Sequence, residues 1–281
     1  MSREAQAPVP AAGALIVVAH PDDETLWFEP LLSDDATVIV AFPNHPRAEA
    51  VTAARARIRE RFPFGTMEFL PLQSLDVLGR SDWRRRSPTM FGVALRPDCP
   101  EQIQREYEAN HAKLRELLAP YLAGRSVVYT HNPWGEYGHE EHVQVCRAVL
   151  DAAALAGASV WAWDGLASSD LLRSNMRLRR DYYDPKVAGL ARTTRASDPA
   201  RYRELKALYE ESGAWTWHQG YSLPAAMDYV EIMAQGRELL LPTPPGRVAR
   251  ATGILAGHVR SAPRVVGRLL AHRAARDRPM A

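Results

Sequence analysis

The sequence His-Pro-Asp-Asp-Glu over residues 20–24 is the part of this chain best suited to chemistry. It places one imidazole and two adjacent aspartates directly after residues 14–19, an apolar stretch typical of a buried strand. A histidine and a carboxylate can hold a divalent metal, and a second carboxylate beside them can face an attacking water. His20 and Asp23 are three residues apart, so in a turn that enters a helix both can lie on one side, with Asp22 pointing elsewhere.

The alternative for the two aspartates is structural. Aspartate is a favoured N-cap and acidic residues stabilise the first turn of a helix, so Asp22 or Asp23 could simply cap a helix that begins near Glu24. This first motif does not separate the two interpretations by itself, because short motifs often occur by chance.

A second polar cluster, Tyr-Gly-His-Glu-Glu-His over residues 137–142, follows a strand-like run at 126–130 and opens a helical pattern at 141–156. His139 and His142 are three residues apart and project from one face if both lie in the first helical turn. The carboxyl ends of parallel strands form the ligand crevice of an open α/β sheet, so polar clusters at two strand ends can converge. The two motifs together predict a His/Asp/His metal site with additional acid-base groups.

The pair of motifs resembles that of the LmbE-like, or PIG-L, de-N-acetylase family. Residues 19–24 are similar to the family signature Ala/Pro-His-Pro-Asp-Asp-Glu, and residues 137–142 are similar to its second, His-x-x-His motif. The resemblance extends in order and spacing over roughly the first 165 residues. It implies a Rossmann-like fold and the hydrolysis of N-acetyl groups from sugars or sugar conjugates with a divalent metal, usually zinc.

The resemblance also implies roles for individual residues: His20, Asp23 and His142 as metal ligands, Asp22 as general base, and His139 as the group that assists the oxyanion or the leaving amine. The family commonly has Asp before the last histidine, whereas this chain has Glu141; because a Glu side chain is one methylene longer, the geometry must adjust if this acid orients His139. Zn²⁺ is the expected cofactor, with Fe²⁺ or another divalent ion as the alternative, because such a donor set accepts several metals. Asp22→Ala is expected to keep metal and lose most turnover, and His142→Ala to lose metal.

Alternating strand-like and helix-like segments predict a Rossmann-like α/β fold, with a mostly parallel sheet and helices on both faces, in a single domain. The predicted strands are 14–19, 37–42, 68–71, 126–130 and 158–163, and the predicted helices are 23–32, 47–62, 101–122, 141–156 and 198–211. A nucleotide- or S-adenosylmethionine-binding domain shares this layout. It is disfavoured because the turn after the first strand carries two carboxylates, which would repel a pyrophosphate, and because G-x-G-x-x-G and P-loop sequences are absent.

Length and composition agree with an enzyme that has one large core. The chain has 281 residues, of which 46% are apolar and 24% charged, and its two cysteines do not form a disulfide framework. No signal-peptide pattern and no run of about 18 apolar residues occurs, so a cytoplasmic location is expected. We divide the chain into a flexible N-terminus (1–12), an LmbE-like catalytic domain (13–245) and a basic C-terminal extension (246–281).

The net charge of +2 conceals a strongly basic tail. Residues 247–281 hold eight Arg and one Asp, a balance of +7 that leaves −5 for the remainder. Arginines spaced among aliphatic residues are compatible with an amphipathic helix that contacts an anionic membrane, so a membrane-peripheral location is an alternative, as is a loosely docked tail. Nucleic acid is not an expected partner, because no aromatic platform accompanies the arginines.

Aromatic residues near the second motif are candidates for substrate contacts. Trp134 and Tyr137 flank His139, and His218 lies in a later aromatic stretch, so these side chains are expected to line a sugar site, with ordinary packing as the alternative. The predicted function is removal of the N-acetyl group from an N-acetylated amino sugar or glycoconjugate. The alternatives are an amidase of the same fold that cleaves a larger acyl group, as in thiol conjugates, and a noncatalytic glycan-binding descendant.

Overall fold

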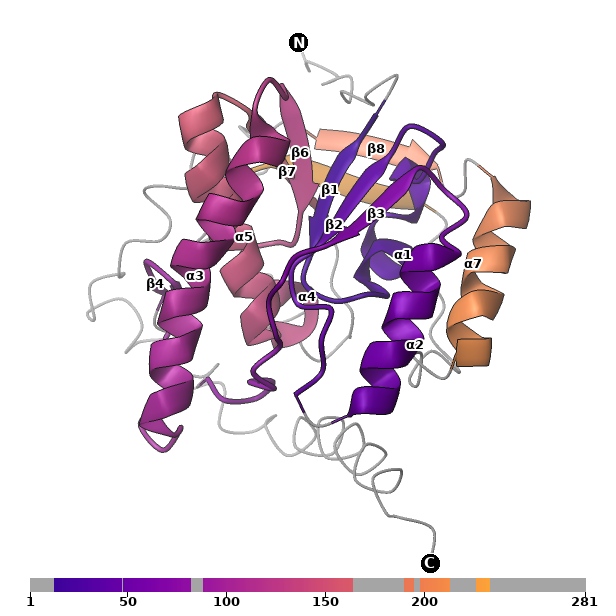
Figure 1. Ribbon diagram of the computed structural model, residues 1–281. Coiled ribbons are helices and arrows are strands. Elements are labelled where there is room, and N and C mark those ends of the chain that lie inside the picture. Colours follow the sequence, from indigo (N-terminus) through magenta and orange to yellow (C-terminus); the bar gives the residue numbers. More distant parts are fainter. Residues whose placement is uncertain are drawn as a thin grey trace, which may run out of the picture.

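The computed structural model describes residues 13–46, 48–81, 88–163, 190–194, 198–212 and 226–232. Its main sheet has the strand order β3-β2-β1-β6-β7-β9-β8 (Figure 1). These strands are β1 (Leu15–Val18), β2 (Thr37–Val40), β3 (Thr66–Phe69), β6 (Val127–Thr130), β7 (Ser159–Trp163), β8 (Leu190–Thr194) and β9 (Ala226–Glu231). The strands from β3 to β7 are parallel, and β9 runs antiparallel to both β7 and β8. The predicted mostly parallel α/β sheet is therefore confirmed.

Helices cover both faces of this sheet, as predicted (Figure 1). The helices α3 (Glu101–Leu122) and α5 (Glu140–Ala156) enclose one core, and α1 (Asp23–Trp27), α2 (Glu49–Glu60) and α7 (Pro199–Ser212) lie over the other. Successive side chains of a strand point to opposite faces, so Leu15 and Val17 enter the first core while Ile16 and Val18 enter the second. A strand buried on both sides must be apolar throughout, which explains the uninterrupted sequence of β1.

Two of the predicted elements end earlier in the structure than predicted because of proline. The helix predicted at 23–32 stops at Trp27 and is followed by a short 3₁₀ helix, η1 (Glu29–Leu31), because Pro30 cannot continue an α-helix. The third strand ends at Phe69 instead of Pro71, which has no N–H for the ladder. The connection before α3 contains a small antiparallel hairpin of β4 (Pro88–Thr89) and β5 (Gly92–Val93).

The order of the strands places the two sequence motifs together. The chain proceeds from β1 outward through β2 and β3 in one direction, and from β6 to β7 in the other. Ligands of open α/β sheets bind at such a reversal, beyond the carboxyl ends of the strands. The loops that follow β1 and β6 therefore border one crevice, and these loops carry the motifs at residues 20–24 and 137–142.

The predicted N-terminus (1–12) and basic extension (246–281) lie outside the described residues, and the division of the chain stays a prediction. Among the residues that the structure describes, each helix is too short or too polar to span a bilayer.

Candidate metal centre and active site

His20 and Asp23 lie where the chain leaves β1 and enters α1. The His20 backbone N–H donates to Asp23 Oδ2 at 2.8 Å, which holds the carboxylate beside the imidazole. His20 Nε2 lies 2.7 Å from Glu141 Oε2, and His20 Nδ1 lies 3.6 Å from Asp23 Oδ2. An ionised carboxylate only accepts hydrogen bonds, so in its neutral form the ring carries its proton on Nε2 and presents the Nδ1 lone pair toward Asp23. Although burial lowers the pKa of His20, Asp23 and Glu141 outweigh burial and raise it.

His142, in the first turn of α5, presents its other nitrogen to the same carboxylate. Its Nδ1 lies 2.7 Å from Glu136 Oε2, and its Nε2 lies 3.4 Å from Asp23 Oδ1. Burial lowers the pKa of His142, which favours the neutral ring, and the Glu136 carboxylate at Nδ1 means that the neutral ring carries its proton there. The Nε2 atom is buried and has no hydrogen-bond partner among the described residues. A buried lone pair that faces a carboxylate oxygen is costly unless a cation joins them.

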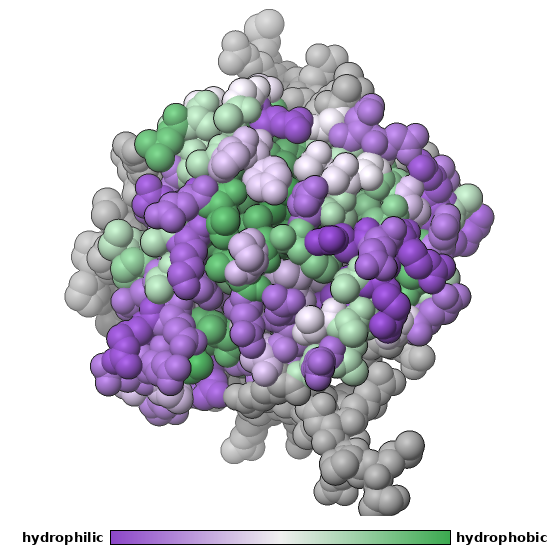
Figure 2. Space-filling view, viewed as in Figure 1, coloured by the Kyte–Doolittle hydropathy of each residue, from purple (hydrophilic) through white to green (hydrophobic). Residues whose placement is uncertain are grey.

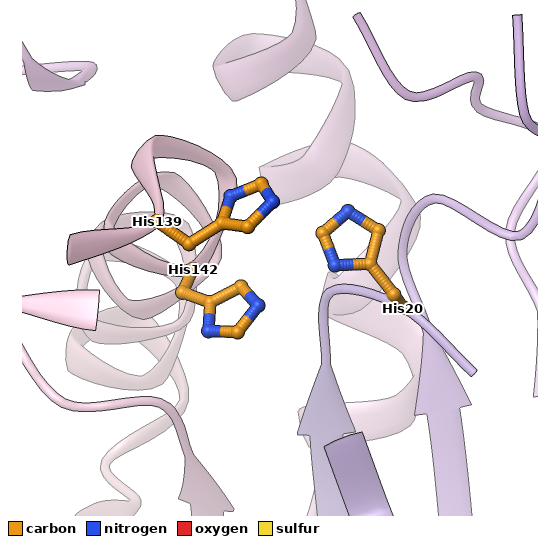
Figure 3. Close-up of side chains that lie close together, drawn as sticks. All are labelled: His20, His139 and His142. Carbon is orange, nitrogen blue, oxygen red and sulfur yellow. The ribbon is translucent and has the colours of Figure 1, made fainter. Parts of the chain in front are cut away.

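These positions fit a divalent metal. Ligand atoms around tetrahedral zinc lie roughly 3.3 Å apart when each is about 2.0 Å from the ion. Asp23 Oδ1 lies 3.4 Å from His142 Nε2 and the other oxygen, Oδ2, lies 3.6 Å from His20 Nδ1, so each distance is close to that spacing while the two imidazoles face different oxygens of the carboxylate. His20, His139 and His142 also offer ligand atoms within 4.8 Å of one another, and Figure 3 shows their rings around a shared space. The far nitrogen of both His20 and His142 contacts a carboxylate, the arrangement that orients metal-binding imidazoles.

Asp22 occupies the N-cap position of α1, yet its side chain makes no capping hydrogen bond. Its backbone has a φ of 113°, a left-handed conformation that costs a non-glycine residue about 1–3 kcal/mol. Burial and the neighbouring Asp23 carboxylate raise the pKa of Asp22 well above its ordinary value. The capping alternative therefore does not explain this residue, whereas a carboxylate of raised proton affinity beside a metal site suits a general base.

His139 is the N-cap of α5, and its Nδ1 accepts the Glu141 backbone N–H at 3.2 Å. A neutral His139 ring therefore carries its proton on Nε2, where it can be donated. The Glu141 carboxylate contacts His20 and not His139, and it also accepts from Ser74 Oγ at 2.9 Å and from the Leu75 backbone N–H at 2.6 Å. The Glu141 carboxylate therefore orients His20, and it is the Glu141 backbone N–H that contacts the His139 ring.

His131 and Glu136 were not among the predicted site residues. His131 follows β6 directly, so its position at a strand end was a usable signal, whereas nothing in the sequence marked Glu136. His131 Nδ1 lies 3.0 Å from Glu136 Oε2, and its Nε2 accepts the Ala19 backbone N–H at 2.9 Å. Both ring nitrogens are engaged in this way, so His131 supports the site although it lies within ligand distance of Asp23 and His142.

The buried charges of this site favour a cation. The carboxylates are all buried: Asp22, Asp23, Glu24, Glu136 and Glu141. Although burial lowers the pKa of His131, Glu136 and Asp23 outweigh this effect and raise it to about 10, whereas the backbone N–H that His131 Nε2 accepts from Ala19 favours the neutral ring. Although burial raises the pKa of Asp23, His142 and His131 lower it well below the ordinary value. The buried carboxylates create a negative potential that stabilises positive charge. Protons on the histidines or a divalent metal can supply that charge.

The three predicted substrate contacts have different outcomes. Trp134 is completely buried and belongs to the core under α3 and α5, so it packs and does not line an open site. Tyr137 is half-buried, and its ring centroid lies 5.3 Å from that of His142 and 5.9 Å from that of His139, so it is placed beside the site. His218 lies outside the described residues.

The sequence over residues 15–153 matches the PIG-L family, described as GlcNAc-PI de-N-acetylase. The match includes both motifs. No curated protein matches the chain significantly.

Comparison with solved structures finds the fold of this chain in a protein of low sequence identity, and the similar structures include the following. A deacetylase–bog complex from the teicoplanin biosynthesis pathway has a TM-score of 0.50 and 12% identity, over 78% of this chain and 97% of that one. A deacetylase–teicoplanin complex from the same pathway has a TM-score of 0.48 and 13% identity, over 78% and 98%. The zinc-inhibited form of teicoplanin deacetylase has a TM-score of 0.48 and 11% identity, over 78% and 97%.

Proposed function

We propose that the chain is a hydrolase of the deacetylase type that removes the acetyl group from an N-acetylated amino sugar or glycoconjugate, since residues 15–153 match the PIG-L family. The proposed cofactor is a divalent metal held by His20, Asp23 and His142, Zn²⁺ before Fe²⁺. One observation carries this proposal: two imidazoles, each with a carboxylate on its far nitrogen, turn their other nitrogens toward the same Asp23 carboxylate. Such a set has little use in a protein that only binds glycans, since binding alone requires neither a metal site nor a base.

The proposed reaction divides between two residues beside the metal ligands. A bound divalent metal supplies Lewis acidity, which lowers the pKa of water and polarises a carbonyl. Asp22 accepts the proton of the attacking water as the water oxygen bonds to the acetyl carbon. His139 Nε2–H donates a hydrogen bond to the developing oxyanion, and the proton taken up by Asp22 then passes to the amide nitrogen as the C–N bond breaks. The products are acetate and the free amino sugar, without a covalent enzyme intermediate.

The experiment that tests this proposal combines metal quantification with product analysis. The purified full chain is incubated with a panel of N-acetylhexosamine conjugates, and the carboxylic acid released is identified and quantified. Asp22→Asn is a sharper variant than the alanine change, because asparagine tolerates the left-handed backbone that Asp22 adopts. We expect Asp22→Asn to bind metal normally and to release acetate about 10²- to 10⁴-fold more slowly, the usual contribution of a general base.

Asp151→Asn is the matched control, because it removes a carboxylate on α5 that pairs with His111 and Arg147, away from the site. This control should keep its turnover. A longer acid in place of acetate would identify an amidase of the same fold. A protein that binds no metal, or an Asp22→Asn variant with wild-type turnover, would contradict the proposal.

A further inference from the structure

We propose that Tyr209, on α7 and outside the PIG-L match, is a positioning residue that acts through Glu24 to hold Asp22 in its active backbone conformation. This inference rests on the proposed function, since it takes Asp22 as the general base. It concerns a residue that neither sequence motif contains.

A continuous chain of hydrogen bonds joins Tyr209 to the backbone of Asp22. The Tyr209 hydroxyl donates to Glu24 Oε1 at 2.6 Å, and the Thr25 hydroxyl donates to the same oxygen at 2.7 Å. The other carboxylate oxygen, Glu24 Oε2, accepts the Asp22 backbone N–H at 3.0 Å. Tyr209 and Glu24 are both completely buried, so water does not replace these bonds easily.

Asp22, at the end of this chain of hydrogen bonds, has a strained backbone conformation. Asp22 has a φ of 113°, which side chains other than glycine rarely adopt. Its carbonyl accepts the backbone N–H groups of Thr25 and Leu26, both at 3.1 Å, so the start of α1 fixes one side of the residue. The Glu24 carboxylate fixes the other side through the N–H. Strained conformations of this kind persist where surrounding contacts determine them, often at functional sites.

The packing of α7 fixes the position of Tyr209. The helix packs against α1 and α2, as Figure 1 shows on the right of the sheet. Leu205 and Leu208 of α7 are buried in the core beneath these helices. A second tyrosine of α7, Tyr202, donates to the Thr25 carbonyl at 3.3 Å. The loop after β1 is therefore set by a helix from far along the chain.

Tyr209→Phe tests the proposal, because it removes one hydroxyl and keeps the ring. We expect kcat for acetate release to fall about 10- to 100-fold, as small displacements of a catalytic group have effects of this size. The KM and the dissociation constant for Zn²⁺ should stay within twofold of the wild type, because the metal ligands keep their contacts. An effect on KM or on metal affinity as large as that on kcat would overturn the proposal.

Tyr229→Phe is the matched control. Tyr229 is also completely buried, and its hydroxyl donates to the Trp27 carbonyl at 2.8 Å, at the opposite end of α1 from Asp22. Both variants lose a buried hydrogen bond to the same segment, so both should lower the melting temperature, but only Tyr209→Phe should lower kcat. Equal losses of kcat in the two variants would mean that Tyr209 acts on stability alone and would overturn the proposal.

A double-mutant cycle with Glu24→Gln provides a second test that does not depend on one variant. Residues that act as one chain are not additive, so the double variant should lose little more kcat than the more impaired single variant. Losses of kcat that multiply, as for independent residues, would overturn the proposal.

If the wild type hydrolyses no conjugate, the proposed function fails. Crystal structures of the wild type and of Tyr209→Phe then decide the positioning role separately. A left-handed Asp22 in both would refute it, and its loss only in the variant would support it.

Discussion

Replacing Glu136 by glutamine is the change that most directly tests the metal centre. Glu136 Oε2 lies 2.7 Å from His142 Nδ1 and 3.0 Å from His131 Nδ1, while Oε1 accepts the Asn132 backbone N–H at 2.9 Å. A glutamine that keeps its carbonyl oxygen on Asn132 turns its NH₂ group toward His142 Nδ1 and toward the protonated Nδ1 of His131, so both imidazoles lose their acceptor. His142 must then accept at Nδ1 and carry its proton on Nε2, which removes the lone pair that faces Asp23.

The expected size of the effect follows from the electrostatics of Glu136. Burial raises the pKa of Glu136, but His131 and His142 outweigh burial and lower the pKa from 4.5 to about 2. A change of this size corresponds to roughly 3 kcal/mol in favour of the ionised carboxylate. Removing a carboxylate that orients a metal-binding histidine commonly weakens metal affinity by about 10- to 100-fold. We therefore expect Zn²⁺ affinity to fall within that range, about 1.4–2.8 kcal/mol.

The assay is a competition titration of Zn²⁺ against a chromophoric chelator, with the metal-free melting temperature measured in parallel. Glu140→Gln is the matched control, because Glu140 is also completely buried but accepts from the Gly79 and Ser81 backbone N–H groups instead of imidazoles. It should lower stability and leave metal affinity within twofold. If Glu136→Gln bound Zn²⁺ as tightly as the wild type, the tautomer argument for His142 would be refuted.

Three further measurements follow from the structure. Chelation of the metal should abolish acetate release, and Zn²⁺ restored at 100 times its dissociation constant should raise the free energy of unfolding by about 2.7 kcal/mol, measured by denaturation with and without the ion. Leu118→Ala should lower this free energy by about 2–5 kcal/mol in urea denaturation with unchanged Zn²⁺ affinity, because Leu118 is completely buried on α3. Although burial raises the pKa of Asp151, His111 and Arg147 outweigh it and lower the pKa below 3.8, so ionised Asp151 stabilises the fold above that pH. The stability difference between the wild type and Asp151→Asn should therefore shrink as the pH falls from 6 to 3, and a difference that grows would contradict this sign.

Local sequence patterns predicted the parallel part of the fold well because residues next to each segment, such as proline and glycine, mark where it begins and ends. α3 has the predicted range of 101–122, with Pro100 before its first residue and Gly124 shortly after its last. The antiparallel strands β8 and β9 were not predicted, since strand direction at a sheet edge depends on contacts between distant segments. The hairpin of β4 and β5 has two residues in each strand, too few for a periodic signal.

The site shows the same division between local and distant information. His20, Asp23 and His142 could be placed from two strand ends, because parallel strands bring their carboxyl ends to one edge. Glu136 could not be placed from the sequence, because its position depends on a backbone turn with positive φ. Tyr209 could not be placed either, because it belongs to a helix far along the chain. Trp134 has the right residue type and position but a buried side chain, which periodicity in so short a loop does not reveal.

The two adjacent aspartates show most clearly how position divides chemical work. Asp23 faces His131 and His142, which lower its pKa well below the ordinary value despite burial, so it remains an ionised ligand. Burial and the neighbouring Asp23 carboxylate raise the pKa of Asp22, although the positive charge of Arg55 opposes this shift. Carboxyl groups whose environments push their pKa values apart can take different roles, one as a fixed charge and one as a proton acceptor. The left-handed backbone of Asp22 lies at the point where the surroundings of the two carboxyl groups diverge, so the strained residue is also the one whose carboxyl group is suited to accept a proton.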